Sequence, residues 1–135
     1  MNRRHFIAAS TAALIVPSLT QAAALNYTPG LADARLKAGE TVFLDFKASW
    51  CTTCRAQERV INALKAENPA YAQQITFINV DWDDHKKDSL TQRLAIPRRS
   101  TLVVLKGNLE LGRIVAGTRK SDIKALMDKA LQASA

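Results

Sequence analysis

The junction between a dense apolar run and a helix is the feature that most constrains this chain, because both cysteines lie there. The run Val42–Phe46 is apolar except for Asp45 and predicts a buried strand. From about Thr52 to Glu67, apolar residues recur at the spacing of an α-helix. Cys51 and Cys54 therefore lie where a predicted helix begins, directly after a predicted strand.

This placement of the cysteines favours chemistry over a structural role. Unpaired backbone N–H groups and the helix dipole favour a thiolate at Cys51, and Cys54, one turn on, can attack a mixed disulfide formed there. A bridge that closes so short a loop constrains little of the unfolded chain. A closed metal site needs about four ligands. Beyond the first two dozen residues His85 is the only histidine, so we expect no metal and no cofactor in a monomer.

The rest of the chain alternates between helical and extended patterns. Together these segments predict one α/β domain with a central mixed sheet of four to five strands flanked by helices. The expected helices are Leu31–Lys37 (closed by Gly39), Ser89–Leu94 and a last helix with Ser121 as N-cap, and the further strands are Ile75–Val80, Leu102–Leu105 and Leu111–Val115.

The first 24 residues have the pattern of a secretory signal, and residues 25–135 form the predicted domain. Arg3 and Arg4 precede the apolar run Phe6–Val16, and small residues follow, so we expect cleavage after Ala22 or Ala24. Export by the twin-arginine route and by the Sec route are both open. The expected location is the periplasm. The mature chain contains no apolar stretch that approaches a membrane span, so we expect no stable membrane insertion.

The formal net charge of +7 raises the question of nucleic acid as a partner. The basic residues are scattered along the chain, and an exported protein meets little nucleic acid. We therefore expect no nucleic-acid partner and assign the charge to the solvated surface.

The stretch from Asp45 to Arg55, with its Trp-Cys-x-x-Cys motif, resembles the active-site segment of thioredoxins. The similarity extends from about Lys37 to Leu131 and includes Asn79–Asp81, Thr101–Leu105 and Gly117.

The resemblance implies the thioredoxin fold and a role for each matching residue. Cys51 is then an exposed nucleophile, Cys54 a buried resolving thiol, and Trp50 packs beside them with Arg55 in support. Asp45 matches the buried acid that takes a proton from the resolving cysteine. Burial of a carboxyl in an apolar strand raises its pKa, which suits proton exchange near neutral pH.

Asp45 and Glu58 together are similar to the acidic residues of the periplasmic thioredoxin-like domain of DsbD. Glu58 is open to two interpretations, a carboxylate that slows the thiols and a solvated helix residue. The resemblance implies disulfide-containing exported proteins as substrates and a membrane electron donor of the DsbD or CcdA kind.

The sequence departs from the family at the cis-proline that precedes the Thr-Leu strand. In register with Thr101, that position holds Ser100, which we favour, whereas an alternative register places Pro97 there. With serine, we expect a trans bond or a locally strained loop, and a hydroxyl that can donate to the Cys51 thiolate. Arg99, Ser100 and Thr101 are the expected substrate-binding residues. Arg98 and Arg99 either stabilise the thiolate or are solvated.

These observations predict a periplasmic thiol-disulfide oxidoreductase, and specifically a disulfide reductase. Two alternatives remain open at this point: a non-catalytic binding or chaperone module, and a dimer that holds a metal or iron–sulfur cluster through four cysteines. The acidic run Asp81–His85 is interpreted as a solvated loop with an exposed His85.

Overall fold

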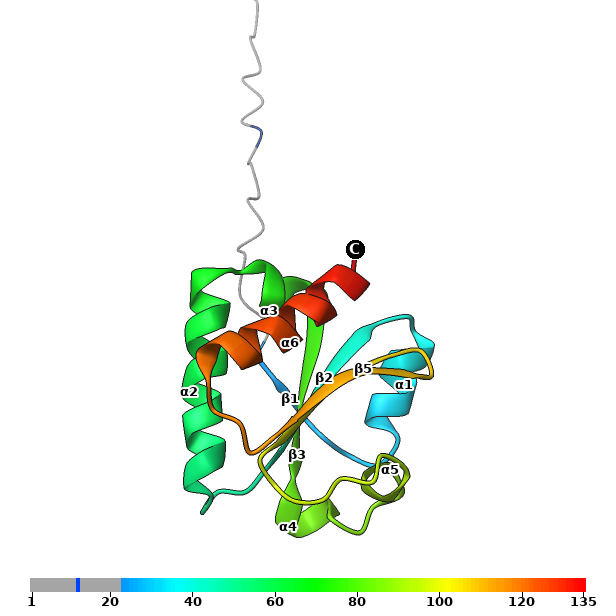
Figure 1. Cartoon of the computed structure of the whole chain (residues 1–135). Coiled ribbons are helices and arrows are strands. Elements are labelled where there is room, and N and C mark those ends of the chain that lie inside the picture. The colour runs from blue at the N-terminus through cyan, green and yellow to red at the C-terminus, as the bar shows by residue number, and fades with distance from the viewer. Residues whose placement is uncertain (1–11, 13–22) are drawn as a thin grey trace, which may run out of the picture.

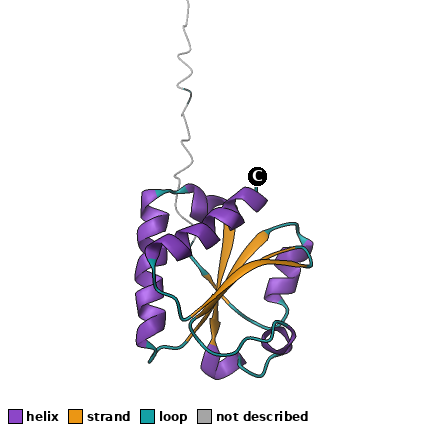
Figure 2. Ribbon diagram, viewed as in Figure 1, coloured by secondary structure: helices purple, strands orange, loops and turns teal. Residues whose placement is uncertain are grey.

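The computed structural model describes Ala12 and residues 23–135, so the expected signal peptide lies almost wholly outside the described residues. Figure 1 shows a sheet with helices on both sides, and Figure 2 gives the same view by secondary structure. The strands are β1 (Leu25–Asn26), β2 (Thr41–Lys47), β3 (Ile75–Asp81), β4 (Thr101–Lys106) and β5 (Leu109–Val115). The helices are α1 (Leu31–Lys37), α2 (Thr52–Glu67), α3 (Ala70–Gln74), α4 (Trp82–His85), α5 (Ser89–Arg93) and α6 (Lys120–Ala133).

The five strands form one mixed sheet in the order β1-β3-β2-β4-β5. The pairs β1–β3 and β3–β2 are parallel, whereas β4 runs antiparallel to both β2 and β5. The central strand β2 is buried along almost its whole length, which explains its continuous apolar composition. Its carboxyl end leads directly to the cysteines, so the buried central strand of the sheet positions the site.

Alternation along β2 separates two hydrophobic cores. Phe43 points to the face covered by α2, α3 and α6, where it packs with residues such as Ile61 and Met127. Val42, Leu44 and Phe46 point to the other face, which α1 and α5 cover (Figure 1). Asp45 shares the side of β2 that faces α2, so a carboxyl lies within an otherwise apolar layer.

The structure confirms the predicted α/β class and mixed sheet, and α1 and α2 have the expected bounds. The proposed N-cap of the last helix is wrong, because α6 begins at Lys120 with Arg119 as its N-cap. The short elements β1, α3 and α4 were not predicted, since each has too few residues to show a period. Among the described residues, none of the helices combines the length and hydropathy needed to cross a membrane.

Candidate active site

The two cysteines form a disulfide at the N-terminus of α2. Their Cα atoms are 5.3 Å apart, within the usual range for a disulfide. Cys51 is the N-cap, and its Sγ accepts a hydrogen bond of 3.1 Å from the backbone N–H of Cys54. A backbone N–H of the first helical turn, which has no acceptor within the helix, therefore points at the sulfur that is expected to become the thiolate.

The expected exposure of Cys51 is wrong, because only 2% of the residue is accessible in this disulfide form. Cys51 packs with Ala48 and Cys54 in a small apolar cluster, against which the half-buried Trp82 of α4 also packs. Cys54 is buried at 1%, as expected for the resolving thiol. Attack on Cys51 from outside therefore requires some movement of the residues around it.

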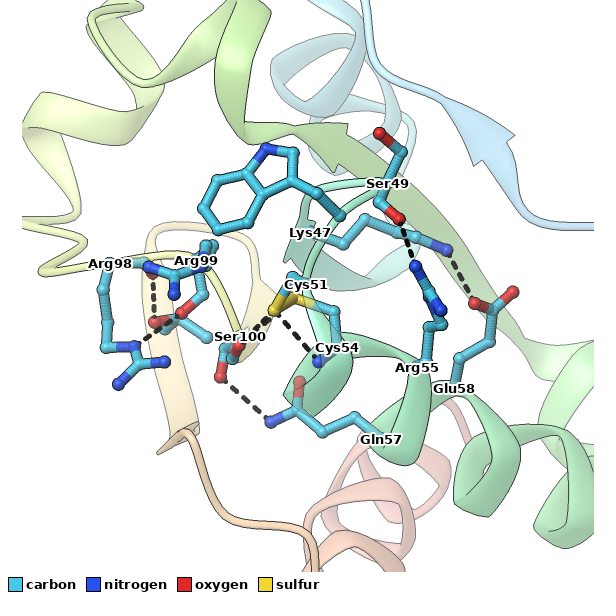
Figure 3. Close-up of a disulfide and its surroundings, with 12 residues drawn as sticks. Lys47, Ser49, Cys51, Cys54, Arg55, Gln57, Glu58, Arg98, Arg99 and Ser100 are labelled. Atoms are coloured by element: carbon cyan, nitrogen blue, oxygen red, sulfur yellow. Dashed lines mark hydrogen bonds and ion pairs between the residues drawn. A yellow bond between two sulfur atoms is a disulfide. The ribbon is translucent and has the colours of Figure 1, made fainter.

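Ser100, and not Pro97, supplies the group that contacts the disulfide. Its Oγ lies 3.1 Å from the Sγ of Cys51 and 3.1 Å from the Sγ of Cys54 (Figure 3). The described residues contain no cis peptide bond, and Ser100 has a φ of +63°. The local strain expected for a serine at this position is thus present, as a left-handed backbone conformation.

Trp50 and Arg99 lie next to the disulfide on two different segments. The Arg99 guanidinium is 4.4 Å from the centre of the Trp50 ring, and Trp50 Nε1 donates to Asp83 of α4 at 2.9 Å. Arg99 thus pairs with an aromatic ring, and both Arg98 and Arg99 are half-buried instead of fully solvated. The Arg99 Nε is buried without a hydrogen-bond partner in the described part of the chain.

Asp45 is a buried carboxyl, 6% exposed, at the middle of the sheet. Its pKa is raised to about 7, chiefly by burial; the negative charge of Glu58 adds to the rise, and the positive charges of Lys47 and Lys65 oppose it. Its Oδ1 has no hydrogen-bond partner among the described groups. Asp45 also lines a cavity of about 40 Å³ with Glu58 and Lys65, which is large enough for a water molecule.

Glu58 agrees with the interpretation as a surface helix residue, and its effect on the thiols stays a prediction. It is half-exposed and pairs with Lys47 at 3.1 Å (Figure 3), as a surface residue would. It also acts on Asp45 through its charge. Lys65, which the sequence reasoning missed, lies 3.9 Å from the centre of the Phe77 ring, and burial lowers its pKa.

Three further residues support the loops around the disulfide. Arg55 donates to the Ser49 carbonyl at 3.0 Å, and the Thr101 hydroxyl donates to the Arg98 carbonyl at 2.7 Å. Gln57, which the sequence reasoning also missed, is fully buried, and its Nε2 donates to the carbonyls of Ser100 and Gly117 at 2.9 and 3.0 Å. Gln57 lies at helical spacing from the buried Cys54, Ile61 and Leu64, and that spacing was the available signal.

The acidic run after β3 forms α4 and not a loop, with the Asp81 side chain accepting from the backbone N–H of Asp84. His85 is half-buried, because its ring packs edge-on against Tyr27, and so its expected exposure is wrong. Within the described residues, no cluster of three or more His, Cys, Asp or Glu side chains is suited to a metal ion.

Comparison with known proteins agrees with this geometry. The family model described as Thioredoxin matches residues 25–129. The chain belongs to the thioredoxin family. With this fold and its Cys51–Cys54 pair, it is a thiol-disulfide oxidoreductase.

Individual thioredoxins show the extent of the similarity. The Chlamydia trachomatis thioredoxin is 30% identical over 88 residues, covering 65% of this chain and 80% of the relative. The Echinococcus granulosus thioredoxin is 25% identical over 95 residues, covering 70% and 82%. The crystal structure of Trxlp from Edwardsiella tarda superimposes with a TM-score of 0.66 at 27% identity, covering 77% of this chain and 98% of that one.

Proposed function

We propose that this thioredoxin-family protein is a periplasmic disulfide reductase that acts on exported proteins. Cys51 thiolate attacks a partner's disulfide and displaces one partner thiolate, which leaves a mixed disulfide. Cys54 then loses its proton and attacks the Sγ of Cys51, and the second partner thiolate leaves. Two electrons pass to the partner, and the protein is left with the Cys51–Cys54 disulfide seen here.

The observation that carries the reductase direction is the buried Asp45 beside α2. With a pKa of about 7, it exists in both protonation states near neutral pH. As a base it can take up the proton that Cys54 must lose. As a negative charge it opposes thiolates nearby, which disfavours the dithiol relative to the disulfide and makes the pair more reducing.

Insulin reduction by dithiothreitol tests the activity. The wild-type protein accelerates precipitation of the insulin B chain, whereas Cys51→Ser gives the uncatalysed rate. Equal rates for the two proteins would contradict the proposal and favour a non-catalytic binding module.

A redox titration tests the direction. We expect the wild-type potential to lie near those of reductants such as thioredoxin (about −270 mV) and not near those of strong oxidants (about −120 mV). Asp45→Asn removes the opposing charge and shifts the potential upward. A wild-type value in the oxidant range would contradict the reductase assignment while leaving the dithiol chemistry intact.

The periplasmic location rests on the amino-terminal sequence, and the membrane electron donor rests on the resemblance of Asp45 and Glu58 to the DsbD domain. Cell fractionation followed by amino-terminal sequencing should find a mature chain that begins at Ala23 or Leu25. If the DsbD or CcdA kind of donor supplies electrons, Cys51–Cys54 accumulates as the disulfide in cells that lack it. A full-length protein retained in the cytoplasm would contradict the location.

A further inference from the structure

The Ser100 hydroxyl contacts both sulfurs of the reactive pair at the same distance, 3.1 Å. A hydroxyl has one proton to donate and two lone pairs that accept. In the reduced protein it is therefore able to accept from one thiol while it donates to the other sulfur as a thiolate. In the disulfide form the Ser100 hydroxyl already lies within hydrogen-bonding distance of both sulfurs, where it can donate to either one.

The backbone holds Ser100 in place on both sides. Its N–H donates to the Phe46 carbonyl at 2.7 Å, and its own carbonyl accepts from Ala116 N–H at 2.8 Å and Gln57 Nε2 at 2.9 Å. The φ of +63° is uncommon for a residue with a side chain, and these three bonds stabilise it. Ser100 is fully buried, so water does not compete for the hydroxyl.

The two sulfurs differ in the other donors available to them. The Cys51 Sγ also accepts from the backbone N–H of Cys54, whereas for the Cys54 Sγ the hydrogen-bonding contact in the described structure is Ser100. A thiolate at Cys51 thus has two donors, and a thiolate at Cys54 depends on one. Loss of the hydroxyl is therefore more costly for the Cys54 thiolate.

We propose that the Ser100 hydroxyl serves the two cysteines in turn, donating first to the Cys51 thiolate of the reduced protein and then to the Cys54 thiolate of the mixed disulfide. In the reduced protein the Cys54 thiol donates to Ser100 Oγ, whose proton points to Cys51. Once Cys51 is bonded to the partner's sulfur and Cys54 has lost its proton to a base, the hydroxyl rotates toward Cys54. Cys54 then attacks Cys51, and the partner leaves as a thiolate.

Reaction of the reduced protein with excess Ellman's reagent separates the two steps. Cys51 attacks the reagent in a concentration-dependent phase that releases the first thionitrobenzoate. Cys54 then releases the second in a phase that is independent of reagent concentration. This reagent needs no physiological partner and no assumed redox direction, so failure of the reductase proposal would not affect the result.

Three variants distinguish the hydroxyl from the backbone. Ser100→Ala removes the hydroxyl and keeps the side-chain carbon, whereas Ser100→Gly removes the hydroxyl and also relieves the positive φ, which protects the fold. Ser49→Ala deletes an exposed hydroxyl from the same region and is the matched control.

We expect both Ser100 variants to slow the second phase roughly three- to tenfold near neutral pH, because fewer Cys54 thiols ionise while each thiolate becomes somewhat more nucleophilic. The first phase slows less, and Ser49→Ala matches the wild type. An unchanged second phase in either Ser100 variant would overturn the proposal. Slowing in Ser100→Ala alone would assign the effect to backbone strain and would overturn it equally.

Discussion

The Arg99 guanidinium lies over the Trp50 ring beside the reactive disulfide. Arg99 immediately precedes Ser100, and Trp50 immediately precedes Cys51. The contact of 4.4 Å between the guanidinium and the ring therefore joins the same two segments as the Ser100–Cys51 contact. Trp50 is 53% exposed, whereas Cys51 is 2% exposed. The hydrogen bond from Trp50 to Asp83 also connects this pair to α4.

We predict that Arg99→Ala makes Cys51 more reactive toward small reagents. A cation–π contact at an exposed site is worth about 0.5–1 kcal/mol, so its loss should raise the alkylation rate of Cys51 roughly two- to fivefold. The rate is measured on the reduced protein with neutral iodoacetamide, at a pH high enough to ionise the thiol fully, so that the lost positive charge has little effect. Arg98→Ala is the matched control, and equal rates for Arg99→Ala and the wild type would show that the pair does not limit access.

Gln57 ties the helix that carries the cysteines to the loops before β4 and after β5. We predict that Gln57→Leu destabilises the protein by about 1–3 kcal/mol, because the Gly117 carbonyl loses a buried donor. Urea unfolding of the disulfide form measures the change. Gln73→Leu, at an exposed position of α3, should change stability by less than about 0.5 kcal/mol. A Gln57→Leu protein as stable as the wild type would contradict the role of this bond.

The sequence predicts those elements whose apolar residues form a continuous run or recur at a regular spacing. The apolar run of β2 and the spacing of Val60, Ile61 and Leu64 in α2 are long enough to identify a strand and a helix, and the cysteine motif follows from their junction. Asp45 is also recognisable in the sequence, because its carboxyl interrupts an apolar strand.

The features that were missed depend on distant contacts. Burial of Cys51 comes from Trp82 and Ser100, which lie 31 and 49 residues further along the chain. His85 is half-buried because of Tyr27, and α4 has too few residues for a period. Gln57 looks like a surface glutamine until its two carbonyl partners are known.

The charges around Asp45 act on it in opposite directions, which gives a paired prediction. Glu58→Gln should lower the pKa of Asp45 below about 7, because a repelling negative charge is removed. Lys47→Met should raise it, because an attracting positive charge is removed. Carbon-detected NMR titration of the Asp45 carboxyl in the disulfide form measures both, with Glu67→Gln as an exposed control paired to Lys120. Shifts of the same sign in the two variants would contradict this account.

Burial of Asp45 makes the stability of the protein depend on pH. The pKa is about 7 in the folded protein and 3.8 for an ordinary aspartate, so between these values the folded state holds a proton that the unfolded chain has released. Since the unfolded state binds fewer protons, the contribution is fully present below about pH 4, falls as pH rises, and is lost above about pH 7.

We therefore predict that Asp45→Asn, which keeps the shape and cannot ionise, gains stability relative to the wild type as pH rises from 4 to 8. The relative gain should approach roughly 4 kcal/mol, since one pKa unit corresponds to about 1.4 kcal/mol. Urea unfolding of both disulfide forms across this range measures the difference, with the exposed, ion-paired Asp33→Asn as a control. A difference between Asp45→Asn and the wild type that stays constant with pH would mean that Asp45 has the same pKa in the folded protein as in the unfolded chain. That result would remove the titration near neutral pH on which the proposed proton transfer from Cys54 to Asp45 depends.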